Sequence, residues 1–143
     1  MDNHPPIEDL RPIYLESKVI AVVGASPDTS KRANIVPSYL QDEGYRIIPV
    51  NPNHDEILGQ RSYATLSDIQ EPVDVVDVFR PADETPQIAE QAAAIGAKVL
   101  WLQLGIVSDA AAKIAHDAGM TYVSDLCMGV THAKLGLGSG PNG

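Results

Sequence analysis

A stretch near the start of the chain combines a glycine turn with hydroxyl and cationic side chains. It reads VIAVVGASPDTSKRANIV over residues 19–36. Its polar side chains include Ser26, Ser30, Lys31, Arg32 and Asn34. Hydroxyls and cations bind phosphate oxygens, and the free N–H groups at a helix N-terminus favour the same anions. Lys31 and Arg32 could instead be solvated charges, but cations at that end of a helix oppose its dipole. The stretch therefore predicts a phosphate-binding loop.

The loop departs from the glycine pattern of ordinary dinucleotide-binding proteins. That pattern is G-x-G-x-x-G, whereas here Gly24 is followed by Ala25 and Ser26, and the next glycine is Gly44. The acidic residue that would bind a ribose 2′-hydroxyl is also absent, because the second apolar run ends in PVNP at residues 49–52. Both features argue against NAD or NADP as the ligand.

Short apolar runs alternate with longer amphipathic segments along the chain. The predicted strands are residues 19–24, 46–50, 73–79, 98–103 and 121–125. The predicted helices are residues 7–17, 32–43, 83–96 and 108–119. Residues 56–72 are expected to form a connector with a glycine turn and a short helical piece at 66–69. This alternation predicts an α/β fold, a Rossmann-like doubly wound parallel sheet of about five strands with helices on both faces.

In such sheets ligands bind beyond the carboxyl ends of the strands. The loops at those ends are residues 24–34, 50–55, 79–84, 103–108 and 124–129. The chain has only ten lysines and arginines, and Lys31, Arg32 and Arg80 fall in these loops. The net charge is −9, which argues against a nucleic-acid partner and makes these cations informative.

The bulk properties are those of one ordinary domain. We expect a single domain over residues 1–143, with a leading helix or arm at 1–18 and a flexible tail at 136–143. The single cysteine excludes an intramolecular disulfide framework and suits a reducing compartment. Without a signal peptide or a membrane-length apolar run, the expected location is the cytoplasm and no membrane partner is expected. Exposed sheet edges are consistent with a homo-oligomer.

Five segments carry a resemblance to a known family. They are VVGAS, GYRIIPVNP, EILGQRSYATLSDI, VDVVDVFRP and VLWLQLGI, in that order, and the likeness covers roughly residues 10–130. Together they resemble the small single-domain CoA-binding proteins, which are similar to the nucleotide-binding domain of the succinyl-CoA synthetase α subunit. The resemblance implies a Rossmann-like domain that binds coenzyme A or acyl-CoA, usually without established catalysis.

The resemblance also implies a role for individual residues along the ligand. These are Gly24, Ala25 and Ser26 at the pyrophosphate, Lys31 and Arg32 beside its charges, Val50, Asn51 and Pro52 along the adenosine, Phe79, Arg80 and Pro81 lining the cleft, and Gln103 and Gly105 near the pantetheine arm. The last strand departs from the family, because Asp125-Leu126-Cys127 replaces the common Asp-Arg-Cys and no glutamate follows in MGVTHAK. In the synthetase the phosphorylated histidine belongs to a second domain, which we do not expect in this chain.

The remaining reactive side chains predict no catalytic or metal site. The four histidines, His4, His54, His116 and His132, have no acidic or nucleophilic partner in the sequence, so solvated or capping roles are expected. Cys127 is interpreted as a small buried residue, the alternative being a mixed disulfide with the CoA thiol. Asp77 is expected to accept backbone N–H bonds from a neighbouring loop, the alternative being that it faces the cleft.

Three functions stay open from the sequence. The first is non-catalytic binding of coenzyme A or acyl-CoA. The second is an NAD(P)(H)-binding oxidoreductase or redox sensor, for which only the fold argues. The third is a subunit of a split acyl-CoA ligase that requires partner domains.

Overall fold

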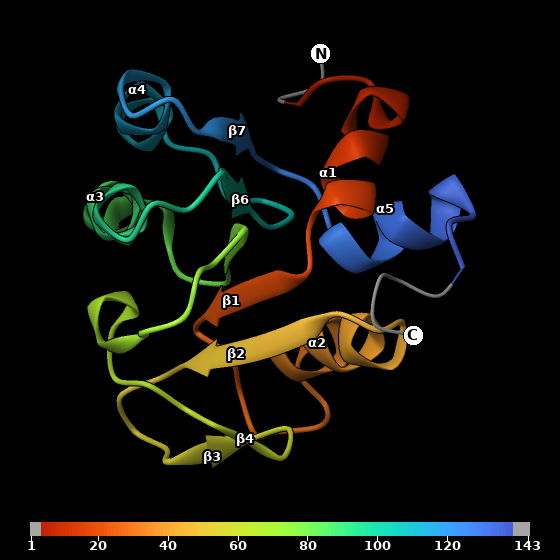
Figure 1. Cartoon of the computed structure of the whole chain (residues 1–143), viewed down its shortest axis with the longest axis vertical. Coiled ribbons are helices and arrows are strands. Elements are labelled where there is room, and N and C mark those ends of the chain that lie inside the picture. Colours follow the sequence, from red (N-terminus) through yellow and green to blue (C-terminus); the bar gives the residue numbers. More distant parts are fainter. Residues whose placement is uncertain (1–3, 139–143) are drawn as a thin grey trace.

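A five-stranded parallel sheet forms the centre of the protein in a computed structural model that describes residues 4–138 (Figure 1). The strand order is β2-β1-β5-β6-β7. The strands are β1 (Val19–Val23), β2 (Arg46–Val50), β5 (Val75–Val78), β6 (Val99–Leu102) and β7 (Thr121–Val123). All neighbours pair in parallel, as the alternating pattern of the sequence predicted, and the predicted fold class is confirmed.

Helices cover both faces of the sheet (Figure 1). One face carries α1 (Arg11–Glu16), α2 (Arg32–Asp42) and α5 (Met128–Leu135), and the other carries α3 (Thr85–Ala94) and α4 (Asp109–Asp117). Short 3-10 turns at Ile7–Leu10 and Ala82–Glu84 precede α1 and α3. Strand β1 is apolar on both faces because Ile20 and Val22 join one core and Ala21 joins the other. No helix within residues 4–138 is long and apolar enough to cross a membrane.

The strand order puts a switch point at the carboxyl end of β1. The chain leaves β1 through α2 on one face to reach β2, and it leaves β5 through α3 on the opposite face to reach β6. The loops that follow β1 and β5 therefore turn away from each other and leave a crevice between them. That is the place where ligands of doubly wound sheets bind.

A small hairpin lies beside β2 that the sequence did not predict. Its strands are β3 (Glu56–Ile57) and β4 (Gln60–Arg61), and both turn residues, Leu58 and Gly59, have positive φ angles of 55° and 71°. Two adjacent positive φ angles are typical of the tight hairpin turn. Strands of two residues show no periodicity, so only the glycine turn was predicted. The helical piece expected at 66–69 is confirmed as a 3-10 turn, Leu66–Asp68.

Helix α5 was also not predicted. Its first residue, Met128, donates its N–H to Gln103 Oε1 over 3.4 Å, and no side chain at the Cys127 N-cap bonds to the helix. The helix ends at Gly136, whose φ is 64°. Residues 136–138 of the predicted flexible tail therefore follow directly after α5. Residues 139–143 of that tail lie outside the described residues.

The solvated or capping role expected for His132 is wrong. The residue lies on α5, is 1% exposed and packs edge-on against the rings of Tyr14, Tyr39 and Tyr45. Its Nδ1 lies 2.8 Å from Tyr39 Oη. Burial lowers the pKa of the imidazole, so His132 is a neutral part of the packing between α5 and α2.

Candidate functional site

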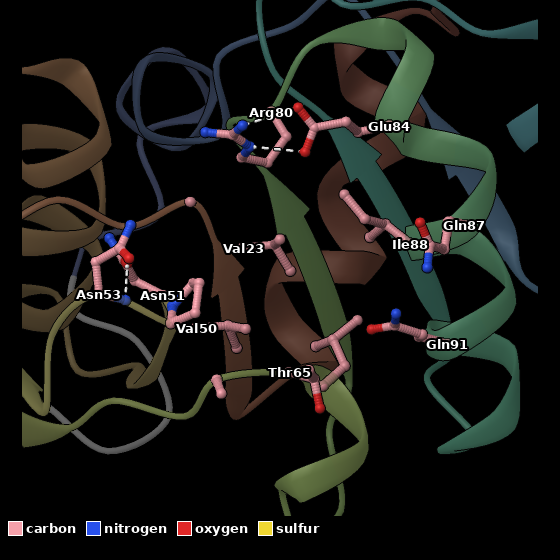
Figure 2. Close-up of a pocket in the computed structure, with 14 residues that line it drawn as sticks. Val23, Val50, Asn51, Asn53, Thr65, Arg80, Glu84, Gln87, Ile88 and Gln91 are labelled. Atoms are coloured by element: carbon pink, nitrogen blue, oxygen red, sulfur yellow. Dashed lines mark hydrogen bonds and ion pairs between the residues drawn. The ribbon is translucent and has the colours of Figure 1, made fainter.

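A cleft of about 320 Å3 lies beyond the carboxyl ends of β1, β2 and β5 (Figure 2). Its lining residues from the strand ends and their loops are Val23, Gly24, Val50, Asn51, Pro52, Asn53 and Arg80. Figure 2 shows Asn51 and Asn53 on one side and Ile88 and Gln91 of α3 on the other. The cleft is thus the crevice at the switch point. Five of the residues predicted from the sequence line it, namely Gly24, Val50, Asn51, Pro52 and Arg80.

The other wall comes from elements that the sequence analysis did not single out. Helix α3 contributes Gln87, Ile88 and Gln91, Glu84 contributes from the turn before it, and residues 64–66 close one end. Positions 84, 87, 88 and 91 have the spacing of one helical stripe. That spacing, on the helix that follows the third predicted strand, is the signal that could have found them.

Gly24 permits a close approach of the first loop to the end of β5. A Cβ at this position would lie 2.9 Å from Arg80 Cδ and 3.1 Å from the Phe79 carbonyl oxygen. Its φ is also positive, at 88°, which favours glycine. The N–H of Gly24 donates to the Val50 carbonyl over 2.9 Å. Gly24 therefore joins the ends of β1, β2 and β5 at the floor of the cleft.

Two asparagines hold the backbone that follows Gly24. Asn51 Nδ2 donates to the Ala25 carbonyl, and Asn34 Nδ2 donates to the Ser26 carbonyl, each over 2.9 Å. Ala25 is fully buried, and the Ser26 N–H donates to the Ala33 carbonyl over 3.1 Å. The amide groups of both asparagines are thus occupied in fixing the loop.

The N-terminus of α2 lies at the end of this loop and has no side-chain cap. Its first N–H groups, at Arg32 and Ala33, precede the point where intrahelical bonding begins. Lys31 and Arg32 are both exposed, and neither forms an ion pair with another residue of 4–138. Uncapped N–H groups beside two unpaired cations form an arrangement that attracts an anion.

One carboxylate lies inside the same loop. Asp28 Oδ1 accepts the Ser30 N–H over 2.9 Å and the Ser30 hydroxyl over 2.7 Å, and the Ser26 hydroxyl accepts the Asp28 N–H over 3.1 Å. The bonds from Ser30 hold the pKa of Asp28 below its ordinary value. Asp28 therefore shapes the loop but brings an ionised carboxylate close to the site for an anion.

Arg80 is partly neutralised. Its guanidinium donates to both carboxylate oxygens of Glu84, over 3.1 and 2.8 Å, and the pair lies at one end of the cleft (Figure 2). The arginine holds the pKa of Glu84 below its ordinary value. Both side chains are about half exposed. Arg80 can therefore reach an anion only if Glu84 moves or shares it.

The two residues expected near a pantetheine arm lie apart from the cleft. Gln103 is buried, donates through Nε2 to Asp77 Oδ1 and accepts from the N–H of Met128. Gly105 is exposed, and its N–H donates to Asp125 Oδ1 over 2.7 Å. Of the other predicted residues, Phe79 packs against the core on the α2 face, and Pro81 is exposed before α3.

Asp77 is completely buried in β5 beneath α5. Burial raises the pKa of its carboxyl to about 7, and the bond from Gln103 opposes that rise. The backbone N–H bonds expected from a loop are received instead by Asp74, from Lys18 at 2.8 Å and Val19 at 3.0 Å. Asp77 is 0% exposed and is not among the residues that line the cleft. Its perturbed pKa thus belongs to the packing of β5, β6 and α5.

Cys127 is 5% exposed, which confirms the interpretation of a small buried residue. Within residues 4–138, no three His, Cys, Asp or Glu side chains come together in a way that could hold a metal ion. The polar side chains of the cleft are asparagine, glutamine, threonine and the Arg80–Glu84 pair. This set can hydrogen-bond a polar ligand and bind an anion.

The family model described as CoA binding domain matches residues 18–133. The chain belongs to this family. The uncharacterized protein YneT of Bacillus subtilis strain 168 is 39% identical over 131 residues, covering 92% of this chain and 97% of that protein. A solved structure of a hypothetical protein from Pyrococcus horikoshii OT3 has a TM-score of 0.88 at 40% identity, covering 94% of this chain and 99% of that one.

The CoA-binding domain is also found within larger enzymes. Acetate–CoA ligase (ADP-forming) I of Archaeoglobus fulgidus is 26% identical over 130 residues, which cover 84% of this chain and 19% of the ligase. The chain therefore spans about a fifth of the length of that ligase. The resemblance noted in the sequence is confirmed at the level of the family and of its relation to ADP-forming acyl-CoA ligases.

Proposed function

We propose that the chain binds coenzyme A or an acyl-CoA without catalysing a reaction by itself. The observation that carries this proposal is the uncapped N-terminus of α2 with two unpaired cations, Lys31 and Arg32, at the end of the loop whose first residue, Gly24, lines the switch-point cleft. A pyrophosphate would lie against this helix end and the Gly24–Ser26 loop. The membership in the CoA-binding domain family supports coenzyme A as the source of that pyrophosphate.

The cleft would receive the adenosine end of the ligand. Its volume of about 320 Å3 lies in the range of small-molecule sites. Val50 and Ile88 offer apolar contacts for an adenine ring, and Thr65 and Gln91 offer hydrogen bonds to its polar edge. Asn51 follows β2 where an NAD-binding protein carries an acidic residue, so a ribose 2′-hydroxyl finds no carboxylate there.

The side chains around the cleft support binding rather than catalysis. Its lining residues include neither a histidine nor a cysteine, and its one carboxylate, Glu84, is paired with Arg80. General acid–base catalysis needs a group that can exchange a proton near neutral pH, and nucleophilic catalysis needs an activated nucleophile. The cleft offers neither.

The test is a calorimetric titration of the Arg32→Glu variant with CoA. Charge reversal at Arg32 removes an attraction to phosphate and adds a repulsion, so we expect affinity to fall by about 10- to 100-fold. Lys113→Glu is the matched control, because Lys113 is an exposed cation on α4 paired with Asp117. Equal loss in both variants, or none in Arg32→Glu, contradicts the assignment of the phosphate site.

A second candidate is a subunit of a split acyl-CoA ligase, and the Archaeoglobus fulgidus ligase favours it. In that case the domain would present its CoA to partner chains that carry the rest of the enzyme. Copurification from the native organism tests this idea. Recovery of ligase chains in constant ratio with this one supports it, and recovery of this chain alone contradicts it.

A further inference from the structure

One cation and one carboxylate face each other in the switch-point cleft. Arg80 is the only cation, and Glu84 the only carboxylate, among the described residues that line it. The guanidinium donates to both carboxylate oxygens, over 3.1 and 2.8 Å. Figure 2 shows this pair at one end of the cleft and Thr65 and Gln91 at the other. A ligand anion can therefore bind Arg80 fully only in exchange for Glu84.

The stem of Arg80 is held beside the start of the first loop. Its Cδ and Cγ lie 2.9 and 3.3 Å from the place that a Cβ of Gly24 would occupy, so the stem packs over this glycine. Arg80 thus lies where the cleft meets the loop that leads to α2. In the proposed function the adenine lies in the cleft and the pyrophosphate against α2. The ribose, which joins them, therefore passes Arg80.

The ribose of coenzyme A carries two kinds of phosphate, a monoester at its 3′-oxygen and the pyrophosphate at its 5′-oxygen. A phosphate monoester has about −1.5 to −2 charge at neutral pH and three terminal oxygens. Each phosphate of the pyrophosphate carries a single charge shared by a pair of free oxygens, as a carboxylate does. Only the monoester therefore offers Arg80 a stronger partner than Glu84.

Glu84 can release Arg80 at a small cost in free energy. Both side chains are about half exposed, so water solvates the carboxylate after the exchange. Glu84 is also the N-cap residue of α3, where the helix dipole favours a negative charge. The bond between the two side chains is therefore weak enough for a ligand to replace.

We propose that Arg80 binds a ribose phosphate in exchange for Glu84, so that the site selects adenine nucleotides that carry a phosphate monoester on the ribose. Glu84 is then a positioning residue, which holds the guanidinium at the cleft in the unliganded protein and competes with weaker anions. The inference rests on the proposed function, because the pyrophosphate at α2 determines where the ribose lies.

Calorimetric titration with CoA and with dephospho-CoA tests this proposal, because the two ligands differ only in the ribose 3′-phosphate. The charge-assisted bonds to Arg80, less the cost of its exposed pair with Glu84, should make CoA bind about tenfold more tightly. If neither ligand binds, the proposed function fails and the inference with it. If both bind with equal affinity, only the inference fails.

Substitution of Arg80 identifies the phosphate that it contacts. Arg80→Gln should weaken CoA binding about tenfold and dephospho-CoA binding by less than about twofold, so that the advantage of CoA disappears. Arg80→Lys keeps the charge without the forked donor geometry and should retain an advantage of about threefold. Equal losses for both ligands in Arg80→Gln would show that Arg80 contacts the pyrophosphate, and would overturn the proposal.

Substitution of Glu84 tests the exchange itself. Glu84→Gln weakens the competing bond and should raise CoA affinity about two- to fivefold, with a change of less than about twofold for dephospho-CoA. Asp83→Asn is the matched control, because Asp83 is exposed in the same 3-10 turn and acts on Arg80 through its charge rather than through a hydrogen bond. Equal gains in the two variants would show a general effect of charge, and would overturn the exchange.

Discussion

At the scale of single residues, the proposed phosphate site contains one side chain that works against its ligand. Asp28 lies between Ser26 and Lys31 in the loop, and its carboxylate is kept ionised by the bonds from Ser30. The same carboxylate shapes the loop. The two effects can be separated because an asparagine retains the Oδ1 acceptor and removes the charge.

We therefore expect Asp28→Asn to bind CoA more tightly than the unmodified protein. Removal of one exposed like charge near the phosphates should improve affinity by about two- to fivefold at low salt, and less at high salt. Asp42→Asn at the far end of α2 is the control, since it changes the net charge equally. Weaker binding by Asp28→Asn, measured by calorimetry, would show that the carboxylate itself is required.

Gly24 is the residue on which the junction of β1, β2 and β5 depends. Gly24→Ala should force Arg80 away from the loop and weaken CoA binding, because the new Cβ would lie 2.9 Å from Arg80 Cδ. Gly59→Ala is the matched control: its φ is also positive, at 71°, but nothing lies within 4 Å of the added Cβ. Both variants should lose about 1 kcal/mol of stability from backbone strain, because both glycines have positive φ. Gly24→Ala should lose more than Gly59→Ala, because only its Cβ collides with neighbouring atoms. Denaturant unfolding and CoA titration of the pair measure this, and equal losses in both contradict it.

At the scale of elements, β5, β6 and α5 are joined by the chain of bonds from Asp77 through Gln103 to the Met128 N–H. Burial raises the pKa of Asp77 to about 7 in the folded protein, against about 3.9 for an unfolded aspartate. From about pH 4 to pH 7 the folded chain retains a proton that the unfolded chain has released. The contribution of Asp77 to stability therefore falls as the pH rises through this range.

Asp77→Asn removes this dependence and should keep the acceptor for Gln103. We therefore expect the free energy of unfolding of the variant, minus that of the unmodified protein, to increase by about 2–3 kcal/mol as the pH is raised from about 5 to about 8. Asp74→Asn provides the contrast, because backbone N–H bonds from Lys18 and Val19 and the nearby Lys98 hold the pKa of Asp74 below its ordinary value. That variant should show no gain in the same interval. Urea unfolding across the pH series measures both, and a flat difference for Asp77→Asn contradicts the assignment.

At the scale of the whole molecule, the single sheet predicts that ligand binding stabilises the entire domain. A ligand at about a hundred times its Kd adds about 2.7 kcal/mol to the free energy of unfolding, which raises the Tm of a chain of this size by roughly 10 °C. We expect CoA to produce such a shift and NAD to produce none at equal concentration. Thermal unfolding measures this, and a larger shift with NAD would favour the alternative of a nicotinamide-binding protein.

The sequence was informative where the physical signal is local and strong. The five strands were predicted because runs such as VIAVV and RIIPV are apolar on both faces, and the strand-end rule then located Gly24, Asn51 and Arg80 at the cleft. Helix α5 was missed because the partner of its first N–H is Gln103, 25 residues earlier in the chain. The burial of His132 depends on that helix, so it could not be predicted without it. The homo-oligomer expected from exposed sheet edges stays a prediction.

The most direct test of the central claim is a calorimetric titration of the purified protein with CoA, with ATP, NAD and NADPH titrated in parallel. We predict saturable binding of CoA with one site per chain, and weaker or absent binding of the dinucleotides, because the loop after β1 lacks their glycine pattern and β2 lacks their acidic residue. Absence of CoA binding at millimolar ligand, or tighter binding of NAD than of CoA, would contradict the account.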